Sequence, residues 1–221
     1  AAETMRGRLV EAQDAERIIE LGAPKEKVAV TGNMKFDIDM SVDAGKPELL
    51  KASMGLADDY MFLVAGSTHK GEEIIILDAF KKLSAEFPRL KLLIAPRHIE
   101  RSGEVEDAAK TAGFDPVRVS SLRNTNVFIL DMIGQLRDVY AIATIVFIGG
   151  SLVPHGGQNP VEPAALGKPV IFGPHMFNFR EISTTFLANG AAMQVKDSKE
   201  LFDGIRMLLK DPVRRSEMGR N

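Results

Sequence analysis

Short apolar runs alternate along this chain with longer segments in which apolar residues recur at the spacing of a helix. Residues 62–65 (FLVA) and 145–148 (IVFI) contain no polar side chain, which is typical of strands covered on both faces in a parallel sheet. The pattern predicts strands at residues 28–31, 60–65, 90–95, 117–120, 127–130, 144–148, 169–172 and 191–195. It predicts helices at residues 11–21, 47–54, 72–86, 101–112, 133–143, 160–166, 179–188 and 199–210.

This alternation predicts an α/β fold with one doubly wound, mainly parallel sheet of the Rossmann type. Residues 42–51 form the most exposed connection predicted, and they are too short to separate two domains. No terminal element is predicted in the charged stretch after residue 211. Several predicted helices end at a glycine suited to the left-handed C-cap position, namely Gly22, Gly55, Gly113, Gly167 and Gly190.

In a doubly wound sheet, ligands bind beyond the carboxyl ends of the strands. Four loops follow predicted strands, at residues 66–69, 96–98, 149–159 and 173–175. These loops hold all four histidines of the chain, His69, His98, His155 and His175. Their concentration predicts a binding site on that edge of the sheet.

Composition narrows the chemistry that this site can perform. The formal net charge is -2, which gives no overall field for nucleic acid, so no nucleic-acid partner is expected. The chain has no cysteine, which excludes disulfides and thiolate sites. No apolar run reaches the ~18–20 residues that cross a bilayer, so no transmembrane segment is expected. The histidines lie on separate loops without i,i+4 spacing, and no metal site is expected.

The glycine-rich segment after residue 148 has two interpretations. Asn159 is a good N-cap residue, Pro160 suits the first helical position, and Glu162 stands three residues after Asn159, which together would make a capping box. The two glycine pairs at 149–150 and 156–157 favour a loop whose backbone approaches a ligand closely. In that case the helix start would hold an anion and Glu162 would accept both hydroxyls of a ribose.

Two further loops carry groups for an anion. Arg97, directly after a predicted strand, could bind a phosphate with two parallel hydrogen bonds or could simply pair with Glu100 or Glu104 at the surface. Ser67 and Thr68 open a helix and could line an anion pocket or act as its N-cap, with the acidic side chains that follow favourable to the helix dipole.

Six motifs occur in order along the chain: TGNMKFD at 31–37, AGSTH at 65–69, PRH at 96–98, GGSLV at 149–153, GGQNPVE at 156–162 and GPHMFNF at 173–179. Together they resemble the 3-deoxy-D-manno-octulosonic acid (Kdo) transferases. The resemblance extends from about residue 13 to the last residue. Two positions depart from the family pattern, with Gln135 where a glutamate is common and Gln158 where a histidine is common.

The resemblance implies the carboxy-terminal half of a GT-B glycosyltransferase. Residues 13–221 would be the CMP-Kdo-binding domain, and residues 1–12 a remnant of the segment between two domains. The acceptor-binding amino-terminal domain, with the catalytic general base and the membrane association, is expected to be absent, which would leave this chain soluble and inactive alone. Such enzymes move Kdo from CMP-Kdo to a lipid A precursor at the cytoplasmic face of the bacterial inner membrane, in lipopolysaccharide biosynthesis.

The resemblance also implies which residues contact the donor. No cofactor is expected, because CMP is a monophosphate leaving group that cationic side chains and amides can neutralise without a metal. Candidate contacts to the donor phosphate or sugar are Ser67, Thr68, His69 and Lys35. Contacts to CMP are expected at Pro96, Arg97, Ile133, Gly134, Gln135, Asn159, Pro160, Val161 and Glu162.

Two other functions fit the same residues. Another GT-B transferase or an epimerase using a UDP-sugar would share the fold, the glycine loop and the ribose glutamate, and would need more positive charge or amides for a second phosphate. A non-catalytic nucleotide-binding module would need only the pocket.

Overall fold

The computed structural model describes residues 7–9, 12–30, 45–57, 59–121 and 123–221. Contacts along the backbone divide the chain into two compact units, Ala1–Asp39 and Met40–Asn221. The boundary after residue 12, which the family resemblance implies, stays a prediction. Each unit is described by itself.

The first unit is a small βαβ element. Strand β1 (Gly7–Leu9) pairs in parallel with β2 (Val28–Val30), and helix α1 (Ala12–Glu20) and a short 3-10 helix (Lys25–Lys27) connect them. The predicted strand at 28–31 therefore forms, but its partner is β1 in a separate two-stranded sheet, so the expectation of a single sheet was wrong. The pattern could not predict β1 because its three residues, Gly-Arg-Leu, include only one large apolar side chain.

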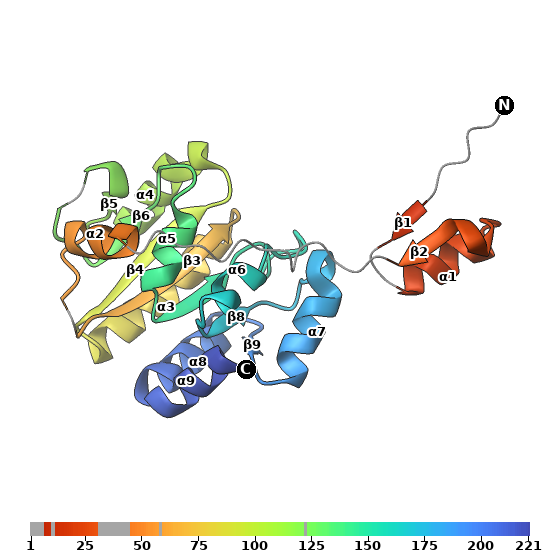
Figure 1. The fold of residues 1–221 in the computed structure, drawn as a ribbon. Coiled ribbons are helices and arrows are strands. Elements are labelled where there is room, and N and C mark those ends of the chain that lie inside the picture. Colours follow the sequence, from red (N-terminus) through yellow and green to blue (C-terminus); the bar gives the residue numbers. More distant parts are fainter. Residues whose placement is uncertain (1–6, 10–11, 31–44, 58, 122) are drawn as a thin grey trace. The chain divides into compact units, whose positions relative to one another are not determined.

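The second unit contains a seven-stranded sheet in the order β5-β6-β4-β3-β7-β8-β9 (Figure 1). Every neighbouring pair of strands in it is parallel. The strands are β3 (Met61–Thr68), β4 (Leu90–Pro96), β5 (Val117–Arg118), β6 (Val127–Ile129), β7 (Ile145–Ile148), β8 (Val170–Phe172) and β9 (Ala192–Gln194). This confirms the predicted doubly wound parallel sheet.

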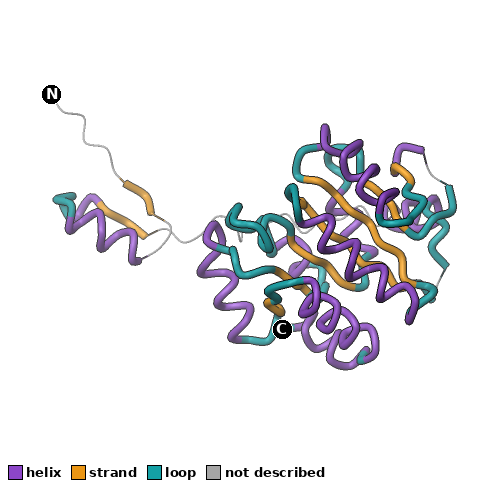
Figure 2. The backbone as a smooth tube through the Cα atoms, turned by 180° about the vertical axis from the view of Figure 1, so that it is seen from behind, coloured by secondary structure: helices purple, strands orange, loops and turns teal. Residues whose placement is uncertain are grey.

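Helices cover both faces of this sheet (Figure 2). The side chains of α3 (Glu72–Glu86), α4 (Ser102–Thr111), α8 (Ser198–Lys210) and α9 (Pro212–Arg220) contribute to one buried cluster. Those of α5 (Leu136–Ile142) contribute to a second cluster, and partly buried side chains of α2 (Gly45–Ser53), α6 (Val161–Ala165) and α7 (Arg180–Ala188), namely Leu50, Ala164 and Phe186, pack against it. Short 3-10 helices lie at Ile99–Arg101, Val119–Ser121 and Phe177–Phe179.

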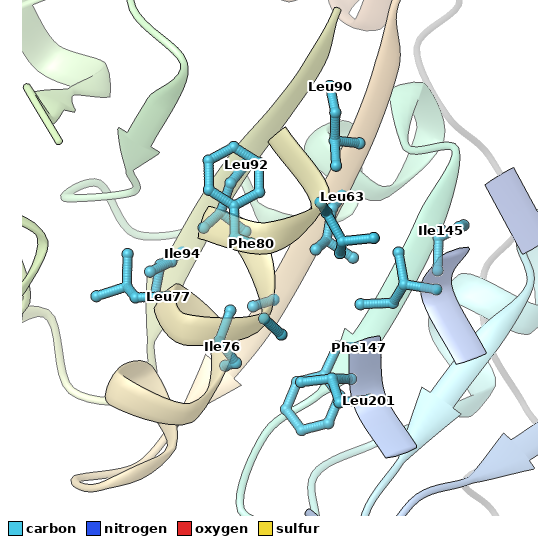
Figure 3. Close-up of a cluster of buried hydrophobic side chains, with 14 of the residues drawn as sticks. Leu63, Ile76, Leu77, Phe80, Leu90, Leu92, Ile94, Ile145, Phe147 and Leu201 are labelled. Atoms are coloured by element: carbon cyan, nitrogen blue, oxygen red, sulfur yellow. The ribbon is translucent and has the colours of Figure 1, made fainter. Parts of the chain in front are cut away.

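The two clusters alternate residue by residue along the strands, because successive side chains of a strand point to opposite faces. Leu63 and Ile145 belong to the first cluster, whereas Phe62 and Val146 belong to the second. Figure 3 shows side chains of α3 lying over the first face, with Phe80 near the strand residues Leu92 and Leu63. Each such fully buried side chain contributes about 1.5–3 kcal/mol through burial of apolar surface. These clusters fix the strands whose ends carry the site.

Helix α9 corrects the expectation that no element follows residue 211. The Asp211 side chain accepts a hydrogen bond of 2.9 Å from the backbone N–H of Arg214, and Pro212 occupies the first turn. Both are ordinary signals for a helix start. Met218 is buried in the first cluster, so one apolar side chain attaches this otherwise charged helix to the domain.

The strand order places a switch point between β3 and β7. From β3 the chain continues to β4 on one side, and from β7 it continues to β8 on the other. The carboxyl ends of β3 and β7 therefore open a crevice where doubly wound proteins bind ligands.

Candidate functional site

A cavity of about 320 Å³ lies at the carboxyl ends of the central strands. Residues at the carboxyl ends of β3 and β4 and residues that follow β4 and β6 line it, together with the loop before α5. Its lining includes five of the residues predicted from the sequence: Ser67, Pro96, Arg97, Ile133 and Gly134. The remaining lining residues are Ala95, His98, Ile99, Glu100, Leu130, Met132 and Leu136.

Arg97 leaves β4 at the edge of this cavity. Its backbone N–H donates a hydrogen bond of 2.9 Å to the carbonyl of Thr68, which ties the end of β4 to the end of β3. Its side chain is exposed and makes no ion pair with the described residues. The alternative pairing with Glu104 is made instead by Arg101, at 3.2 Å. A cation without a protein partner at a cavity edge suits an anionic ligand.

Ser67 stands at an irregularity in β3. The pairing register with β4 shifts between Gly66 and Thr68, and Ser67 has a φ of 55°, the only positive φ among the described residues other than glycine. Such a bulge re-aims a side chain, and strain of this kind gathers at functional sites. Ser67 lines the cavity, as its predicted role requires.

Thr68 differs from its neighbour in its surroundings, and its predicted contact with the donor stays a prediction. Its side chain is fully buried, and its hydroxyl donates a hydrogen bond of 2.9 Å to the carboxylate of Glu73. The same carboxylate oxygen forms an ion pair of 2.9 Å with Arg101. The Thr68 hydroxyl is thus occupied inside the protein and is not presented to a donor. Nor does Ser67 or Thr68 cap α3, because the N-cap position is Gly71.

The Glu72 side chain holds the loop after β7 in place through hydrogen bonds. Its carboxylate is fully buried and accepts hydrogen bonds from the backbone N–H groups of Gly150 (2.6 Å), Ser151 (2.9 Å) and Leu152 (2.9 Å). The N–H of His69 donates to it as well, at 2.8 Å. Amides that could have held a ligand anion therefore hold a carboxylate of the chain itself. The residue pattern did not indicate this contact, because a glutamate in the first turn of a helix usually lies in solvent.

The four glycines of this loop also have neighbours within the chain, which overturns the argument from glycines to a ligand. A Cβ on Gly149 would lie 2.5 Å from the Cα of Thr68, and on Gly150 it would lie 3.1 Å from the His69 ring. At Gly156 and Gly157 a Cβ would crowd Asn178 and Met176. Close packing against the backbone of β3 requires glycine at Gly149, and the positive φ of Gly150, Gly156 and Gly157 (68°, 90° and 75°) favours glycine there as well.

Asn159 and Glu162 are in contact, but not as the predicted capping box. The Asn159 side chain accepts a hydrogen bond of 3.0 Å from the N–H of Val161 and donates one of 3.2 Å to Glu162. The Glu162 carboxylate is thus paired with the amide side chain of Asn159 and is partly exposed. Its negative charge also helps to raise the pKa of Tyr140, after burial of that hydroxyl, which is the larger cause.

The predicted contacts divide into two sets. Pro160 and Val161 are buried at the start of α6, and residues 159–162 do not line the cavity that holds Arg97. Ile133 is 87% exposed, and Gly134 has a φ of 85° in the loop before α5. The side-chain oxygen of Gln135 is buried and has no hydrogen-bond partner among the described residues. An orphaned acceptor beside a cavity is typical of a ligand site.

Three of the four histidines come together as the sequence predicts. The rings of His69 and His155 stack with centroids 4.2 Å apart, and His98 meets His69 edge to face at 6.2 Å. The Gln158 amide nitrogen lies 3.2 Å from Nε2 of His69. Burial lowers the pKa of His69, and the neighbouring His155, His98 and Arg101 lower it further. His175, on the loop after β8, makes no ring contact with this group of described residues.

Some predictions fall outside the described residues or concern absences. Lys35 and the motif at 31–37 lie outside them. Among the side chains that are described, no group of three or more His, Asp or Glu is placed to hold a metal ion. No helix of the described ranges is long and apolar enough to cross a membrane.

The parallel sheet, its switch point and the cavity at its strand ends define a Rossmann-like α/β domain with a ligand site at its strand ends. The sequence pattern of the family "Glycosyl transferases group 1" matches residues 57–221, and the chain belongs to this family. It spans about half the length of the curated Kdo transferases that it matches.

Two such relatives are 3-deoxy-D-manno-octulosonic acid transferases. The protein of Haemophilus influenzae is 38% identical over 96% of this chain and 51% of its own length. That of Aquifex aeolicus is 34% identical over 89% of this chain and 52% of its own length. Among solved structures, the C-terminal CMP-Kdo binding domain of WaaA from Acinetobacter baumannii superposes with a TM-score of 0.75 at 28% identity, covering 85% of this chain and 96% of that domain.

Proposed function

We propose that this chain binds CMP-Kdo as the donor domain of an enzyme that transfers Kdo to a lipid A precursor. The observation that carries the proposal is the cavity at the strand ends, where Ser67, Pro96, Arg97, Ile133 and Gly134 meet. The likeness to the CMP-Kdo binding domain of WaaA covers nearly all of that domain and supports the same donor. In this proposal Arg97 pairs with the phosphate and Glu162 accepts hydrogen bonds from the ribose.

The charges around the cavity favour a monophosphate. Among the described residues, Arg97 is the only lysine or arginine that lines the cavity, and Glu100 also lines it. One arginine suits the single phosphate diester of a CMP-sugar, whereas a second phosphate would stand near Glu100 without a cation. This argues against the UDP-sugar alternative.

Calorimetric titration of the chain with CMP, UMP and UDP separates the candidates. We expect CMP to bind more tightly than UMP and UDP. Tighter binding of UDP would favour a UDP-sugar enzyme. Binding of none of the three would exclude the nucleotide pocket. If the chain is a nucleotide-binding module without catalysis, it would still bind CMP in isolation. In that case Arg97→Ala in the complete parent protein would leave its transferase activity unchanged.

The general base for the acceptor hydroxyl belongs, in this proposal, outside the donor domain. The histidines on the described rim stand on donor-side loops, and in two-domain transferases closure brings the acceptor from the opposite side. A polypeptide of these 221 residues is then expected to bind CMP and to form no Kdo-lipid from CMP-Kdo and a lipid A precursor. Lipid product from this polypeptide alone would contradict the assignment. The complete parent enzyme, which we place at the cytoplasmic face of the inner membrane, is the control.

We also propose that binding and transfer need no metal. Arg97 can neutralise a monophosphate leaving group directly. Asp37 and Asp39 stand two residues apart, a spacing that could hold a cation, and both lie outside the described residues. Transfer by the complete enzyme in the presence of EDTA tests this point, and activity that returns only with Mg²⁺ would contradict it.

A further inference from the structure

Three imidazole rings from three different strand ends meet beside the cavity. His69 follows β3, His98 follows β4 and His155 lies in the loop after β7. The His69 ring is the centre of the group, stacked on His155 with an interplanar angle of 20° and perpendicular to His98 at 87°. His98 also lines the cavity, so the group borders the space assigned above to the nucleotide.

The groups that face His69 do not stabilise the positive charge of its protonated ring. Three of them, His155, His98 and Arg101, disfavour the protonated form, and burial disfavours it most. Glu73 is the carboxylate that favours it, but this group already pairs with Arg101 at 2.9 Å and accepts from Thr68. The carboxylate of Glu72 is likewise occupied, by the backbone amides of the β7 loop.

The Gln158 side chain also contacts the His69 ring. Its amide nitrogen lies 3.2 Å from Nε2 of His69, a distance at which the neutral tautomer protonated on Nδ1 accepts a hydrogen bond from the amide. The group is therefore a set of three imidazoles in ring contact, and one of them, His98, lines the cavity together with Arg97. An anion that enters would supply the missing negative charge and favour protonation of the rings.

We propose that His69, His98 and His155 form the subsite for the carboxylate of the donor sugar acid. The inference rests on the proposed function, because it assumes that the neighbouring cavity holds the nucleotide. The phosphate and the carboxylate of a CMP-linked 2-keto sugar acid are attached to the same carbon, so their sites must adjoin. Arg97 and the histidine group adjoin in this way, since His98 follows Arg97 directly and both line the cavity. Binding of the carboxylate then takes up protons and is stronger at lower pH.

The test uses free Kdo as the probe, titrated into the chain saturated with CMP, with Kdo methyl ester as the matched uncharged probe. We expect Kdo to bind about tenfold more tightly at pH 6 than at pH 8, and the ester to show no such dependence. His69→Gln and His155→Gln should each abolish most of the pH dependence. His175→Gln, which changes a histidine outside the ring group, should leave it unchanged.

The affinity for CMP alone separates failure of this inference from failure of the proposed function. Absence of CMP binding to the unaltered chain would refute the nucleotide pocket itself. Normal CMP binding with Kdo binding that is independent of pH, or unchanged in both variants, would refute only the carboxylate subsite. A pH dependence of CMP binding that His69→Gln removes would show that the histidines bind the phosphate instead, which also refutes it. Melting temperatures of the variants establish that each one is folded.

Discussion

The carboxylate of Glu72 accepts a hydrogen bond of 2.6 Å from the backbone N–H of Gly150, which lies 78 residues further along the chain. With the bonds from Ser151 and Leu152, one buried charge fixes the loop after β7 against the start of α3. The two loops that flank the switch point are thereby held together before any ligand binds. A preformed crevice loses less conformational freedom on binding.

Glu72→Gln should therefore destabilise the domain. The amide keeps one acceptor oxygen but turns its NH₂ group toward backbone N–H groups, which leaves buried donors unpaired. We expect the free energy of unfolding to fall by about 2–4 kcal/mol, since charged hydrogen bonds and unsatisfied buried groups each count for ~1–3 kcal/mol. Urea denaturation measures this. Glu217→Gln, on an exposed side chain, is the control and should change stability by less than about 0.5 kcal/mol.

Gly149→Ala tests whether close packing of the β3 and β7 loops requires the glycine. The added methyl group would lie 2.5 Å from the Cα of Thr68, a backbone atom that cannot move aside. We expect a loss of about 3 kcal/mol or more, because overpacking of this kind shifts backbone. Gly103→Ala, within α4, provides the opposite case. The added methyl group would meet only the side chain of Arg118, at 3.6 Å. It should stabilise by about 0.5–1 kcal/mol, and equal losses in both variants would contradict the packing argument.

The strands and helices of the second unit were predictable because each is a local pattern. The predicted helix at 72–86 has the same bounds as α3, and the seven strands predicted in this unit all form. The pairing of β2 with β1 was not predictable, since which strand pairs with which depends on contacts that a local pattern does not contain. Helix α9 did carry a local signal, an Asp-Pro start, which its high charge obscured.

The candidate site was predictable in position but not in detail. The rule that ligands bind at strand ends placed all four histidines on one rim, and the structure brings the rings of His69, His98 and His155 into contact there. It could not show that the Glu72 carboxylate accepts hydrogen bonds from the backbone N–H groups of the loop after β7, because those bonds join distant segments of the chain. The same limit applies to Thr68, whose hydroxyl has an internal partner in Glu73. The glycines gave a misleading signal because close packing within the protein and close approach to a ligand require the same residue.

Arg97→Ala tests the phosphate contact. Arg97 makes no ion pair with the described residues, so its removal should not affect other protein contacts. We expect CMP binding to weaken by ~2–4 kcal/mol, as for loss of a charged partner. Cytidine, which lacks the phosphate, should weaken far less in the same calorimetric titration. Arg118→Ala, on the edge strand β5, is the control, and equal weakening of CMP and cytidine by Arg97→Ala would show that Arg97 acts on structure alone.

Glu162→Gln tests whether this carboxylate holds the ribose. The substituted amide keeps an oxygen that can accept the hydrogen bond from Asn159, so the melting temperature should barely change. Two adjacent hydroxyls need two acceptor oxygens, and the amide has only one, so CMP should bind roughly tenfold more weakly or worse, as expected for a lost bond to a charged group. The matched variant Asn159→Ala removes the acceptor for the Val161 N–H and should lower stability by ~1 kcal/mol.

A second ligand makes the ribose assignment specific. Deoxy-CMP lacks the 2′-hydroxyl, so it should bind the unaltered chain more weakly than CMP does. In Glu162→Gln the difference between the two ligands should largely disappear, because the group that reads the hydroxyl has been changed. The two ligands and two proteins form a cycle whose coupling free energy isolates this single contact. If the difference between CMP and deoxy-CMP is the same in both proteins, Glu162 does not bind the ribose, and its contact with Asn159 is its whole role.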